Sequence, residues 1–361
     1  MTIAKRGLAA HVERIMLGQS PPGIIYLPLA TASAVYSAGL SARNLLYGSG
    51  LLSPFHASCR VISVGGLTLG GAGKTPLAIH IARLISKKKK VGILSRGYGQ
   101  LAREEALVVS DGATLCPPPP YSADEPYMMA RKLPTIPVVT APKRASGAAV
   151  LVERFGVDVI ILDDGFGHRA LHRDMDIVLV DKHALDPARR KLFPLGYLRE
   201  PPDSLARADV AVVMIRDADD ENKVEEYTSQ IRGFAGKDIH VAVARGGITG
   251  FATPEGKLAD SIPGPALAFC GIADPGGFQR SLEEKGVAVG ALVPFPDHHA
   301  FAEEDMTLLR QEAIRVEAVA VVTTEKDAAR LTGRMGEFGK PLYVAQWELK
   351  LEGFEEEWVG L

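Results

Sequence analysis

The sequence predicts an α/β fold in which a mostly parallel sheet is flanked by helices, with a second, smaller αβ domain. Two observations carry this prediction. Runs of aliphatic and β-branched residues are continuously apolar rather than alternating, as in strands that helices cover on both faces. Segments with helical patterns fall between several of these runs, which is typical of parallel sheets. At 361 residues the chain is too long for one typical core, so two domains are expected.

The first half of the chain holds the clearer alternation of elements. The expected strands are residues 60–64, 91–95, 106–110, 136–140, 157–164, 176–181 and 210–215. The expected helices between them are residues 75–86, 124–132 and 143–155. A polar, acid-rich stretch that starts at Arg216 then opens either a surface helix or a domain boundary.

A second αβ set follows this stretch. Its expected strands are 240–247, 266–273, 290–295, 318–324 and 341–347, and its expected helices are 277–285 and 303–316. We therefore predict three parts, which are an N-terminal apolar segment over residues 1–48, a core domain over 49–234 and a smaller C-terminal domain over 235–361.

Composition and charge exclude several classes of protein. The chain has 41 Lys and Arg residues against 43 Asp and Glu residues, so nothing in its charge indicates nucleic-acid binding. Cys59, Cys116 and Cys270 lie far apart and form no C-x-x-C pair. This spacing argues against a disulfide framework or a zinc site, and it favours a reducing compartment.

The N-terminal segment carries no charged residue between Arg14 and Arg43. A signal peptide is a poor fit because prolines interrupt the apolar region early. A full membrane span is marginal because many positions are Ala, Ser or Gly. A helix from about residue 28 to 47 places Leu29, Ala32, Tyr36, Leu40 and Leu46 towards one side. It is either a buried core helix or a membrane-surface anchor flanked by basic residues.

The stretch VISVGGLTLGGAGKTPLAIH, residues 61–80, contains a candidate phosphate-binding loop. The strict P-loop pattern G-x-x-x-x-G-K-[ST] requires a glycine where Thr68 stands. The physical ingredients remain, because a strand leads into glycines whose backbone N–H groups can surround an anion at a helix N-terminus. Lys74 can reach the β- and γ-phosphates, and Thr75 can bind Mg²⁺. The expected nucleotide-binding residues of the loop are Thr68, Gly70, Gly71, Ala72, Gly73, Lys74 and Thr75.

A second motif, VIILDDGFGH, delivers Asp163 and Asp164 at the carboxyl end of an apolar strand. Ligands of parallel sheets bind beyond these strand ends. Adjacent carboxylates repel each other unless a cation lies between or beside them. We therefore expect Asp163, Asp164 and Thr75 to hold Mg²⁺. The alternative is one capping aspartate beside one that is solvated.

Three further segments give weaker signals. Arg96 in LSRGYG can contact a phosphate, although an ordinary glycine turn explains this segment equally well. Asp124 and Glu125 stand at a helix start, where a capping role accounts for one acid. His298 follows Asp297 in PDHHAFAEED, which suggests a histidine that an acid orients for proton transfer. Solvent-exposed histidines are the alternative.

Together these segments resemble the tetraacyldisaccharide 4'-kinase family of lipid A biosynthesis. The resemblance is carried, in order, by VGGLTLGGAGKTP, LSRGYG, DEPYMMA, DDGFGHRALHRDMDIVLVD, LFPLGYLREP, PDHHAFAEED and TTEKDAARL. It covers the chain from about residue 20 to 347, and the family's own loop has Thr where the first P-loop glycine is expected. The N-terminal apolar segment, followed by ARNLLY, resembles the family's membrane-associating helix.

The resemblance implies that ATP phosphorylates the 4'-hydroxyl of a tetraacylated glucosamine disaccharide 1-phosphate, which gives lipid IV-A. It also implies a P-loop domain, a smaller C-terminal domain that closes over the active site, and a cleft between them. The family's proposed base corresponds to Asp124, its partner to His298, and its paired aspartates to Asp163 and Asp164. These residues and Lys74 are the expected catalytic and Mg²⁺-binding set, and Arg96 is expected at the ATP phosphates.

The implied substrate is a lipid, so the expected partners are this lipid and the membrane surface, with no nucleic acid and no obligate protein partner. A four-chain lipid does not leave a bilayer readily, because each buried methylene contributes about 0.8 kcal/mol. The use of ATP and the low cysteine content place the enzyme on the cytoplasmic face of the bacterial inner membrane. Arg169 or Arg199 is expected to face the anionic lipid.

Three positions depart from the family's pattern. Gly66 stands where Asn is usual, Gly167 where Gln is usual, and Tyr197 where Pro is common. Without the Gln side chain, the turn after the two acids loses possible hydrogen bonds, so the detailed role of this turn does not transfer to this chain.

Other classes of protein share some of these features. A membrane-associated P-loop ATPase or GTPase switch has the same Gly-Lys-Thr loop, but the [NT]KxD motif that reads guanine is missing and TTEKD is only a near match. A dehydrogenase is a third class, against which Gly-Lys-Thr favours a triphosphate loop over a dinucleotide turn.

Overall fold

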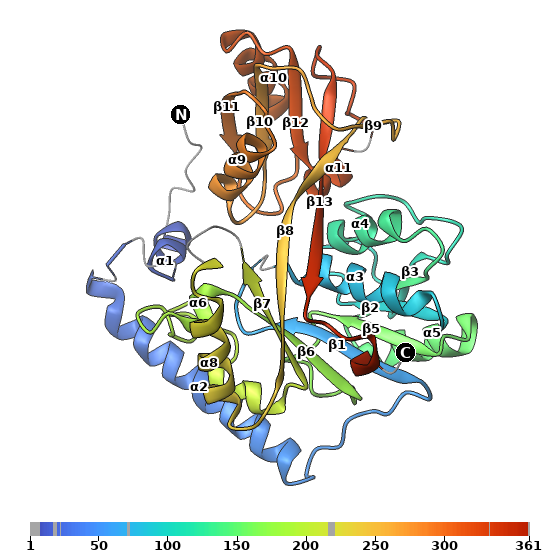
Figure 1. The fold of residues 1–361 in the computed structure, drawn as a ribbon, viewed down its shortest axis with the longest axis vertical. Coiled ribbons are helices and arrows are strands. Elements are labelled where there is room, and N and C mark those ends of the chain that lie inside the picture. The colour runs from blue at the N-terminus through green and yellow to red at the C-terminus, as the bar shows by residue number, and fades with distance from the viewer. Residues whose placement is uncertain are drawn as a thin grey trace.

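The computed structural model describes residues 8–16, 20–21, 23–70, 73–215, 221–331 and 333–359. Its strands form one continuous sheet with helices on both faces (Figure 1). The strand order is β11-β10-β12-β13-β8-β7-β6-β1-β5-β2-β4-β3, with β9 paired to β8. Neighbouring strands are parallel except in the pairs β3–β4, β8–β13 and β8–β9. The predicted α/β fold with a mostly parallel sheet is confirmed.

The strands and helices follow the predicted alternation. The strands are β1 (Arg60–Gly66), β2 (Val91–Ser95), β3 (Leu107–Ser110), β4 (Val138–Thr140), β5 (Val159–Asp163), β6 (Met175–Val180), β7 (Val210–Ile215), β8 (His240–Ala252), β9 (Leu258–Ala259), β10 (Ala266–Cys270), β11 (Val289–Pro294), β12 (Ala320–Thr324) and β13 (Leu342–Glu352). The helices are α1 (Leu8–Met16), α2 (Tyr26–Gly48), α3 (Lys74–Ser86), α4 (Asp124–Lys132), α5 (Arg144–Phe155), α6 (Lys182–Leu185), α8 (Val224–Ala235), α9 (Pro275–Glu284), α10 (Glu303–Arg315) and α11 (Glu325–Arg330).

The central strands are buried along their whole length, which explains their continuously apolar sequences. Helix α3 illustrates how the helices cover the sheet. Its residues Leu77, Ile81 and Ile85 are spaced by four, lie on one face and are fully buried in the core that β1 and β5 share with it. This packing fixes the start of α3 against the carboxyl end of β1, so the glycine-rich loop between them lies at one edge of the sheet.

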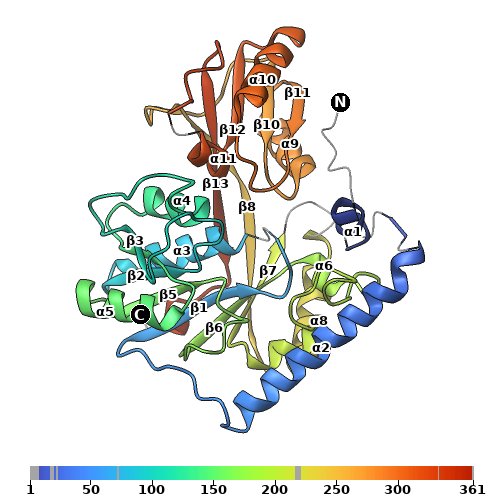
Figure 2. The same ribbon diagram turned by 180° about the vertical axis from the view of Figure 1, so that it is seen from behind.

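The molecule has two lobes (Figures 1 and 2). We name the part built from β1–β7 with α3 to α8 the core lobe, and the part built from β10–β12 with α9 to α11 the small lobe. Strands β8 and β13 pass from one lobe to the other. Strand β8 begins beside β7 at residues 240–245, whereas β13 begins beside β12 at residues 342–345.

Both connecting strands are longer than the predicted 240–247 and 341–347. The C-terminal end of the chain returns to the core lobe, where Leu349 and Val359 join the hydrophobic core under α3. The carbonyl of Val359 also accepts a hydrogen bond from Arg60 at 2.8 Å. The division of the chain at residue 235 stays a prediction, and β8 and β13 contribute to both lobes. Residues 216–220 of the predicted boundary stretch lie outside the described residues.

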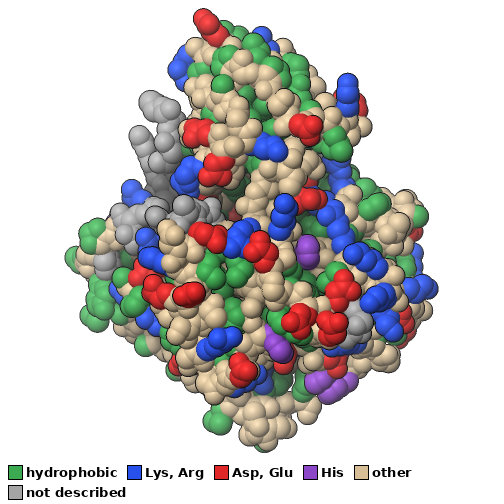
Figure 3. Space-filling model, in the orientation of Figure 1, with side chains coloured by type: hydrophobic (Ala, Val, Ile, Leu, Met, Phe, Trp, Pro, Cys, Tyr) green, Lys and Arg blue, Asp and Glu red, His purple; other side chains and the backbone are tan. Residues whose placement is uncertain are grey.

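Helix α2 lies along the outside of the core lobe (Figure 1). None of its residues is buried, and the region Gly23–Gly48 is long and apolar enough to cross a membrane by length and composition. Its exposed side chains are uncharged and mostly apolar, with Leu27 72% and Val35 69% exposed. Figure 3 shows hydrophobic side chains at the edge of the molecule where α2 begins. The interpretation as a fully buried core helix is therefore wrong.

The inward side of α2 is polar and aromatic. The hydroxyl of Ser33 donates to the carbonyl of Leu192 at 2.9 Å, and the hydroxyl of Tyr36 donates to the carbonyl of Arg199 at 2.9 Å. About two turns further, Arg43 pairs with the buried Glu200 at 2.6 Å. Leu29, Tyr36 and Leu40 of the predicted set are half-buried, whereas Ala32 and Leu46 are exposed. The helix therefore has one side that contacts the segment before and around Glu200, and one apolar side that faces outwards.

Candidate active site

The glycine-rich loop joins β1 to α3, as the sequence predicts. Gly73 directly precedes α3 with a φ of 97°, in the left-handed region that glycine adopts without strain. The ammonium of Lys74 donates to the carbonyl of Gly70 at 2.8 Å, so it folds back over the loop. The hydroxyl of Thr68 donates to Asp181 at 3.0 Å and thus holds the loop to the end of β6. The predicted residues Gly71 and Ala72 lie outside the described residues.

The acid pair lies beside this loop. Strands β1 and β5 are adjacent, with Val64 opposite Asp163, so both strands end at the same edge of the sheet. Asp163 is buried and accepts a hydrogen bond from Ser95 of β2 at 3.1 Å. Burial, with the nearby negative charges of Glu125 and Asp164, raises the pKa of Asp163 to about 7. The fold thus holds a carboxylate where its charged form is disfavoured unless a cation binds.

Asp164 has a different environment from Asp163. Its φ of 50° is unusual for a residue other than glycine and turns the chain sharply after β5. Lys74 lies 3.8 Å from one of its carboxylate oxygens, and Arg199 lies 2.5 Å from the other. Burial disfavours the charged carboxylate, but these two cations outweigh burial and lower the pKa of Asp164. The ammonium of Lys74 therefore forms an ion pair with Asp164, the second residue of the acid pair.

The residues at this edge fit a Mg²⁺ ion. Oδ1 of Asp163 is buried without a hydrogen-bond partner, and such an atom is rare unless a ligand satisfies it. Thr75 is the second residue of α3 and is buried beside the loop, as the predicted metal set requires. Among the described residues no group of three or more His, Cys, Asp or Glu side chains could hold a metal ion. Mg²⁺ sites in proteins commonly keep waters and phosphate oxygens and take only one or two carboxylates.

Asp124 meets His298 across the two lobes. Asp124 begins α4 of the core lobe, and His298 follows β11 in the small lobe. The Nδ1 atom of His298 lies 3.0 Å from Oδ2 of Asp124. The adjacent His299 points elsewhere and lies 2.8 Å from Asp305. Tyr98 of the loop after β2 packs edge-on against the His298 ring at 6.0 Å.

Arg330 of α11 also binds Asp124. Its Nε donates to Asp124 Oδ2 at 2.9 Å, and its Nη2 makes a second, shorter contact. Burial would raise the pKa of Asp124, but the hydrogen bond with His298 and the charge of Arg330 lower it well below its usual range. Asp124 is therefore ionised at every physiological pH.

Lys326, four residues before Arg330, faces the same place. It pairs with Glu125 at 3.2 Å and with Asp297 at 3.0 Å. Burial alone would lower the pKa of Lys326, but these two carboxylates raise it. Lys132, the last residue of α4, and Glu325, the first residue of α11, form a third pair at 2.7 Å. Ion pairs thus join α4 of the core lobe to α11 of the small lobe along their length.

Sequence reasoning missed Lys326 and Arg330, although it noted TTEKDAARL as a strand-to-helix junction. Their spacing of four places both basic side chains on one face of α11. A pair of cations on the first turns of a helix that follows a buried strand was the available signal. Their partners on α4 lie about two hundred residues earlier, so local patterns gave no indication of them.

Arg144 is a third residue that sequence reasoning missed. It begins α5, is buried, and donates to the carbonyls of Ala141 and Pro142 at 3.2 and 3.1 Å. Burial and the nearby charge of Arg96 lower the pKa of Arg144 to about 10. The predicted phosphate ligand Arg96 is itself exposed at the end of β2. The two arginines thus add positive charge beside the acid pair.

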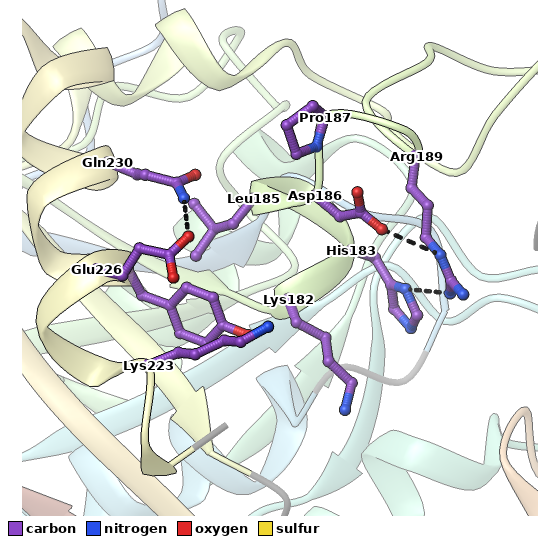
Figure 4. Close-up of a pocket in the computed structure, with 10 residues that line it drawn as sticks. Lys182, His183, Leu185, Asp186, Pro187, Arg189, Lys223, Glu226 and Gln230 are labelled. Atoms are coloured by element: carbon purple, nitrogen blue, oxygen red, sulfur yellow. Dashed lines mark hydrogen bonds and ion pairs between the residues drawn. The ribbon is translucent and has the colours of Figure 1, made fainter. Parts of the chain in front are cut away.

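A pocket of about 250 Å³ lies on the other side of the loop, between α6 and α8 (Figure 4). His183 and Lys223 are among the side chains that line it. It is close to the phosphate loop, because the His183 ring contacts Tyr197 and the Tyr197 hydroxyl lies against Gly70. The acid pair and this pocket therefore flank the loop from opposite sides, since β1 lies between β5 and β6 in the sheet.

The comparisons with known proteins agree with this geometry. Residues 25–359 match the family described as LpxK: Tetraacyldisaccharide-1-P 4'-kinase. A tetraacyldisaccharide 4'-kinase of Anaeromyxobacter sp. (strain Fw109-5) is 40% identical over 334 residues, which cover 89% of this chain and 87% of that relative. Another from Desulfatibacillum aliphaticivorans is 36% identical and covers 96% of this chain and 95% of the relative.

A solved structure is also similar. The crystal structure of the "apo" form of LpxK from Aquifex aeolicus in complex with ATP matches with a TM-score of 0.71 at 30% identity. The match covers 91% of this chain and 96% of that chain. Because the family match spans nearly the whole sequence and the relatives are covered almost end to end, this chain belongs to the tetraacyldisaccharide 4'-kinase family.

Proposed function

We propose that this chain transfers the γ-phosphate of ATP to the 4'-hydroxyl of a tetraacylated disaccharide 1-phosphate, with Asp124 as the residue that receives the hydroxyl proton. The observation that carries this proposal is the contact of Asp124 with His298 beside the phosphate loop. Glu125, the next residue, acts electrostatically on Asp163, which places the start of α4 next to the acid pair. A hydroxyl bound there lies between a carboxylate and the expected γ-phosphate.

The low pKa of Asp124 suits this reaction. Phosphoryl transfer passes through a loose transition state, in which the attacking hydroxyl keeps its proton until late and needs alignment more than a strong base. An ionised carboxylate can accept the hydrogen bond of the hydroxyl and orient its oxygen. His298 lies on the other side of Asp124, where it fixes the orientation of the carboxylate.

Lys74, Thr75 and the acid pair would hold the triphosphate and Mg²⁺. When bound, Mg²⁺ would neutralise the charge that develops on the phosphate oxygens. Lys74 can exchange its contacts with Gly70 and Asp164 for phosphate oxygens, since both contacts are made by its terminal ammonium. Arg96 and Arg144 add positive charge on the same side. The loop N–H groups and the start of α3 provide the remaining donors.

The direction of the triphosphate follows from this arrangement. The γ-phosphate must lie towards Asp124 and Asp164, on the β5 side of the loop. The nucleoside then extends to the β6 side, where the pocket between α6 and α8 lies. We propose this pocket as the position of the nucleoside.

The apolar outer side of α2 would lie on a membrane, so that the acceptor lipid reaches the site without leaving the bilayer. Because ATP is the phosphate donor, this surface would be the cytoplasmic face of the inner membrane. The inner side of α2 contacts Arg199, which in turn pairs with Asp164. The same helix would thus connect the membrane surface to the site.

The direct test is transfer of radiolabel from [γ-³²P]ATP to a tetraacylated disaccharide 1-phosphate in detergent micelles. We expect a labelled lipid with Mg²⁺ present and none after chelation with EDTA, with activity restored by added Mg²⁺. Nucleotide hydrolysis that depends on Lys74 but gives no labelled lipid would indicate a P-loop ATPase or GTPase switch instead. Labelled lipid formed at the full rate in EDTA would contradict the assigned metal site.

Arg330 provides a second test, because its charge keeps the pKa of Asp124 low. We expect Arg330→Gln to raise this pKa, since burial of Asp124 is then opposed by fewer positive charges. In the profile of kcat/KM against pH, the decrease on the acid side should therefore begin at a higher pH than in the wild type. A carboxylate loses its negative charge only as the pH falls through its pKa. The activity of Arg330→Gln should therefore differ least from the wild type at high pH.

Arg330→Lys is the matched control, because it keeps the charge and should leave the low-pH limb near that of the wild type. A profile for Arg330→Gln that is lowered uniformly at all pH values would show that Arg330 acts only through packing of the lobes. Thermal unfolding of both variants separates a loss of folded protein from a change in the profile.

A further inference from the structure

A second pocket lies away from the phosphate loop, at the C-terminal end of α2. Its volume is about 140 Å³, and its lining residues are Tyr47, Pro54, Arg169, Leu171, His172 and Arg173. Helix α2 supplies Tyr47, the loop after α2 supplies Pro54, and the segment between β5 and β6 supplies the rest. None of these residues has a place in the phosphoryl-transfer mechanism described above.

Of the three arginines at or near this pocket, two have a carboxylate partner and Arg169 has none among the described residues. Arg173 is neutralised by Asp176 at 2.9 Å, and Arg43 is neutralised by Glu200 at 2.6 Å. Arg169 differs, because no carboxylate of the described residues lies within ion-pair distance of its guanidinium. A half-buried arginine without a counter-charge is costly unless an anion binds to it.

Arg169 is nevertheless held in one place. Its guanidinium lies over the Tyr47 ring at 5.1 Å, and its Nη1 makes two long contacts with Asn44, at 3.5 Å to the backbone carbonyl and at 3.4 Å to the side-chain Oδ1. Burial, followed by the neighbouring charges of Arg173 and Arg43, lowers the pKa of Arg169, although the charge of Glu200 acts in the opposite direction. The planar donors of such a guanidinium match the oxygens of a phosphate group.

The surroundings of the pocket place it at the membrane side. The loop that follows α2 exposes Leu51, Leu52 and Phe55, so apolar side chains are exposed on this loop as well as on the helix. Pro54 belongs to this loop and also lines the pocket. A lipid phosphate lies just above the apolar layer of a bilayer, so a cation beside exposed apolar side chains is at the matching depth.

Arg169 is also within reach of a ligand at the active site. It lies five positions after Asp164 in the sequence, so the two Cα atoms are at most about 18 Å apart. Arg199, the other arginine expected to face the lipid, instead binds Asp164. Arg169 thus remains as the cation for an anionic group on the lipid.

We propose that this pocket binds the phosphate group of a membrane lipid, with Arg169 as its principal cationic contact. Two lipids carry such a group, which are the acceptor with its own 1-phosphate and an anionic phospholipid beside it. The first case rests on the proposed function, whereas the second does not. The chemistry of recognition, a phosphate oxygen on a guanidinium at the bilayer surface, is the same for both.

The test compares the full-length wild type with Arg169→Gln, Arg169→Lys and the matched control Arg154→Gln. Arg154 makes a similar cation–ring contact, 5.2 Å from the Phe155 ring, at the far end of α5. The first arm measures kinetics in nonionic micelles with the 1-phosphorylated acceptor and with the same disaccharide lipid lacking that phosphate. The second arm measures cosedimentation with phosphatidylcholine vesicles and with vesicles that contain phosphatidylglycerol.

If the acceptor supplies the phosphate, Arg169→Gln should raise KM for the 1-phosphorylated acceptor about tenfold and leave kcat within about twofold. KM for the acceptor without phosphate should stay at the wild-type value. Arg169→Lys should retain part of the affinity, because it keeps the charge but not the planar donors. Arg154→Gln should behave as the wild type.

If a phospholipid supplies the phosphate, Arg169→Gln should reduce binding to the phosphatidylglycerol vesicles about threefold or more, with binding to neutral vesicles unchanged. Wild-type behaviour of Arg169→Gln in both arms would overturn the proposal. If the wild-type chain phosphorylates no lipid, the proposed function fails in the first arm, and the vesicle arm alone decides the role of the pocket.

Discussion

Replacing Asp124 by asparagine is expected to lower lipid phosphorylation by about 10²- to 10⁴-fold, which is the usual contribution of a positioned acid or base. Asparagine keeps the size of the side chain but cannot accept the hydroxyl proton. It also weakens the contacts with His298 and Arg330, which bind the negative carboxylate. The assay is transfer of labelled phosphate to the acceptor lipid, with binding of ATP measured separately.

Binding of ATP by Asp124→Asn should stay close to the wild type, because Asp124 contacts the acceptor rather than the nucleotide. Asp203→Asn, at an exposed position of the core lobe, is the matched control and should retain full activity. Asp124→Asn should also be checked by thermal unfolding, since it removes one of the two carboxylates that pair with Arg330. Normal lipid phosphorylation by folded Asp124→Asn protein would remove Asp124 from the role of base.

The second large effect is expected for Lys74→Met. Methionine fills a similar volume but removes the ammonium that lies between Gly70 and Asp164. Loss of one such charge at the transferred phosphoryl group is expected to reduce kcat by about 10²- to 10³-fold. Affinity for ATP should fall as well, because the same ammonium meets the ground-state phosphates.

Lys88→Met is the control for this change. Lys88 lies two residues after the end of α3, and its side chain forms an exposed pair with Glu356 at 3.6 Å, so its loss should leave activity and ATP affinity unchanged. Lipid phosphorylation and ATP binding by Lys74→Met at wild-type levels would mean that the glycine-rich loop does not hold the triphosphate.

Much of the fold was predictable because its strands are buried on both faces. Such strands have continuously apolar sequences, and helix α4 at Asp124–Lys132 was predicted with the bounds that the structure gives it. The two strands that join the lobes were predicted too short. Gly246, Gly247 and Gly250 lie inside β8, and the end of β13 alternates apolar and charged side chains, so neither reads as a buried strand.

The phosphate loop and the acid pair were identifiable because each motif is local, with a strand, a turn and the polar residues together in the sequence. The partnership of Asp124 and His298 depended on resemblance to a family, since 174 residues separate them. Arg330 was missed because its role depends on how the lobes pack. Arg144 was missed for a different reason, because a single arginine at a helix start gives no sign of burial.

The N-terminal helix α2 was predicted in part and missed in part. The lack of charge along α2 predicted a surface that meets a membrane, and its exposed apolar residues agree with that prediction. The sequence did not indicate that Ser33, Tyr36 and Arg43 form a second, inward side at helical spacing. Their partners are backbone carbonyls and a buried acid of a distant segment, which composition does not reveal.

The connection between the lobes has a mechanical consequence. Between the part of β8 that pairs with β7 and the part of β13 that pairs with β12, the lobes are joined by a two-stranded ribbon, with Gly246–Gly250 opposite Gln346–Leu349. Two-stranded ribbons twist more readily than wide sheets. A movement of one lobe relative to the other would therefore require torsion along this ribbon, because no loose linker joins the lobes at β8 and β13.

The twist of the ribbon in this structure is held at Trp347. The ladder is irregular between Gln346 and Trp347, where the Trp347 ring covers Gly246. The backbone of Trp347 is held from both lobes, because its carbonyl accepts from Lys132 of α4 at 2.9 Å and its N–H donates to Glu325 of α11 at 3.3 Å. The twist of the ribbon is therefore held at Trp347 by α4 and α11, the same two helices that bring Asp124 to Arg330.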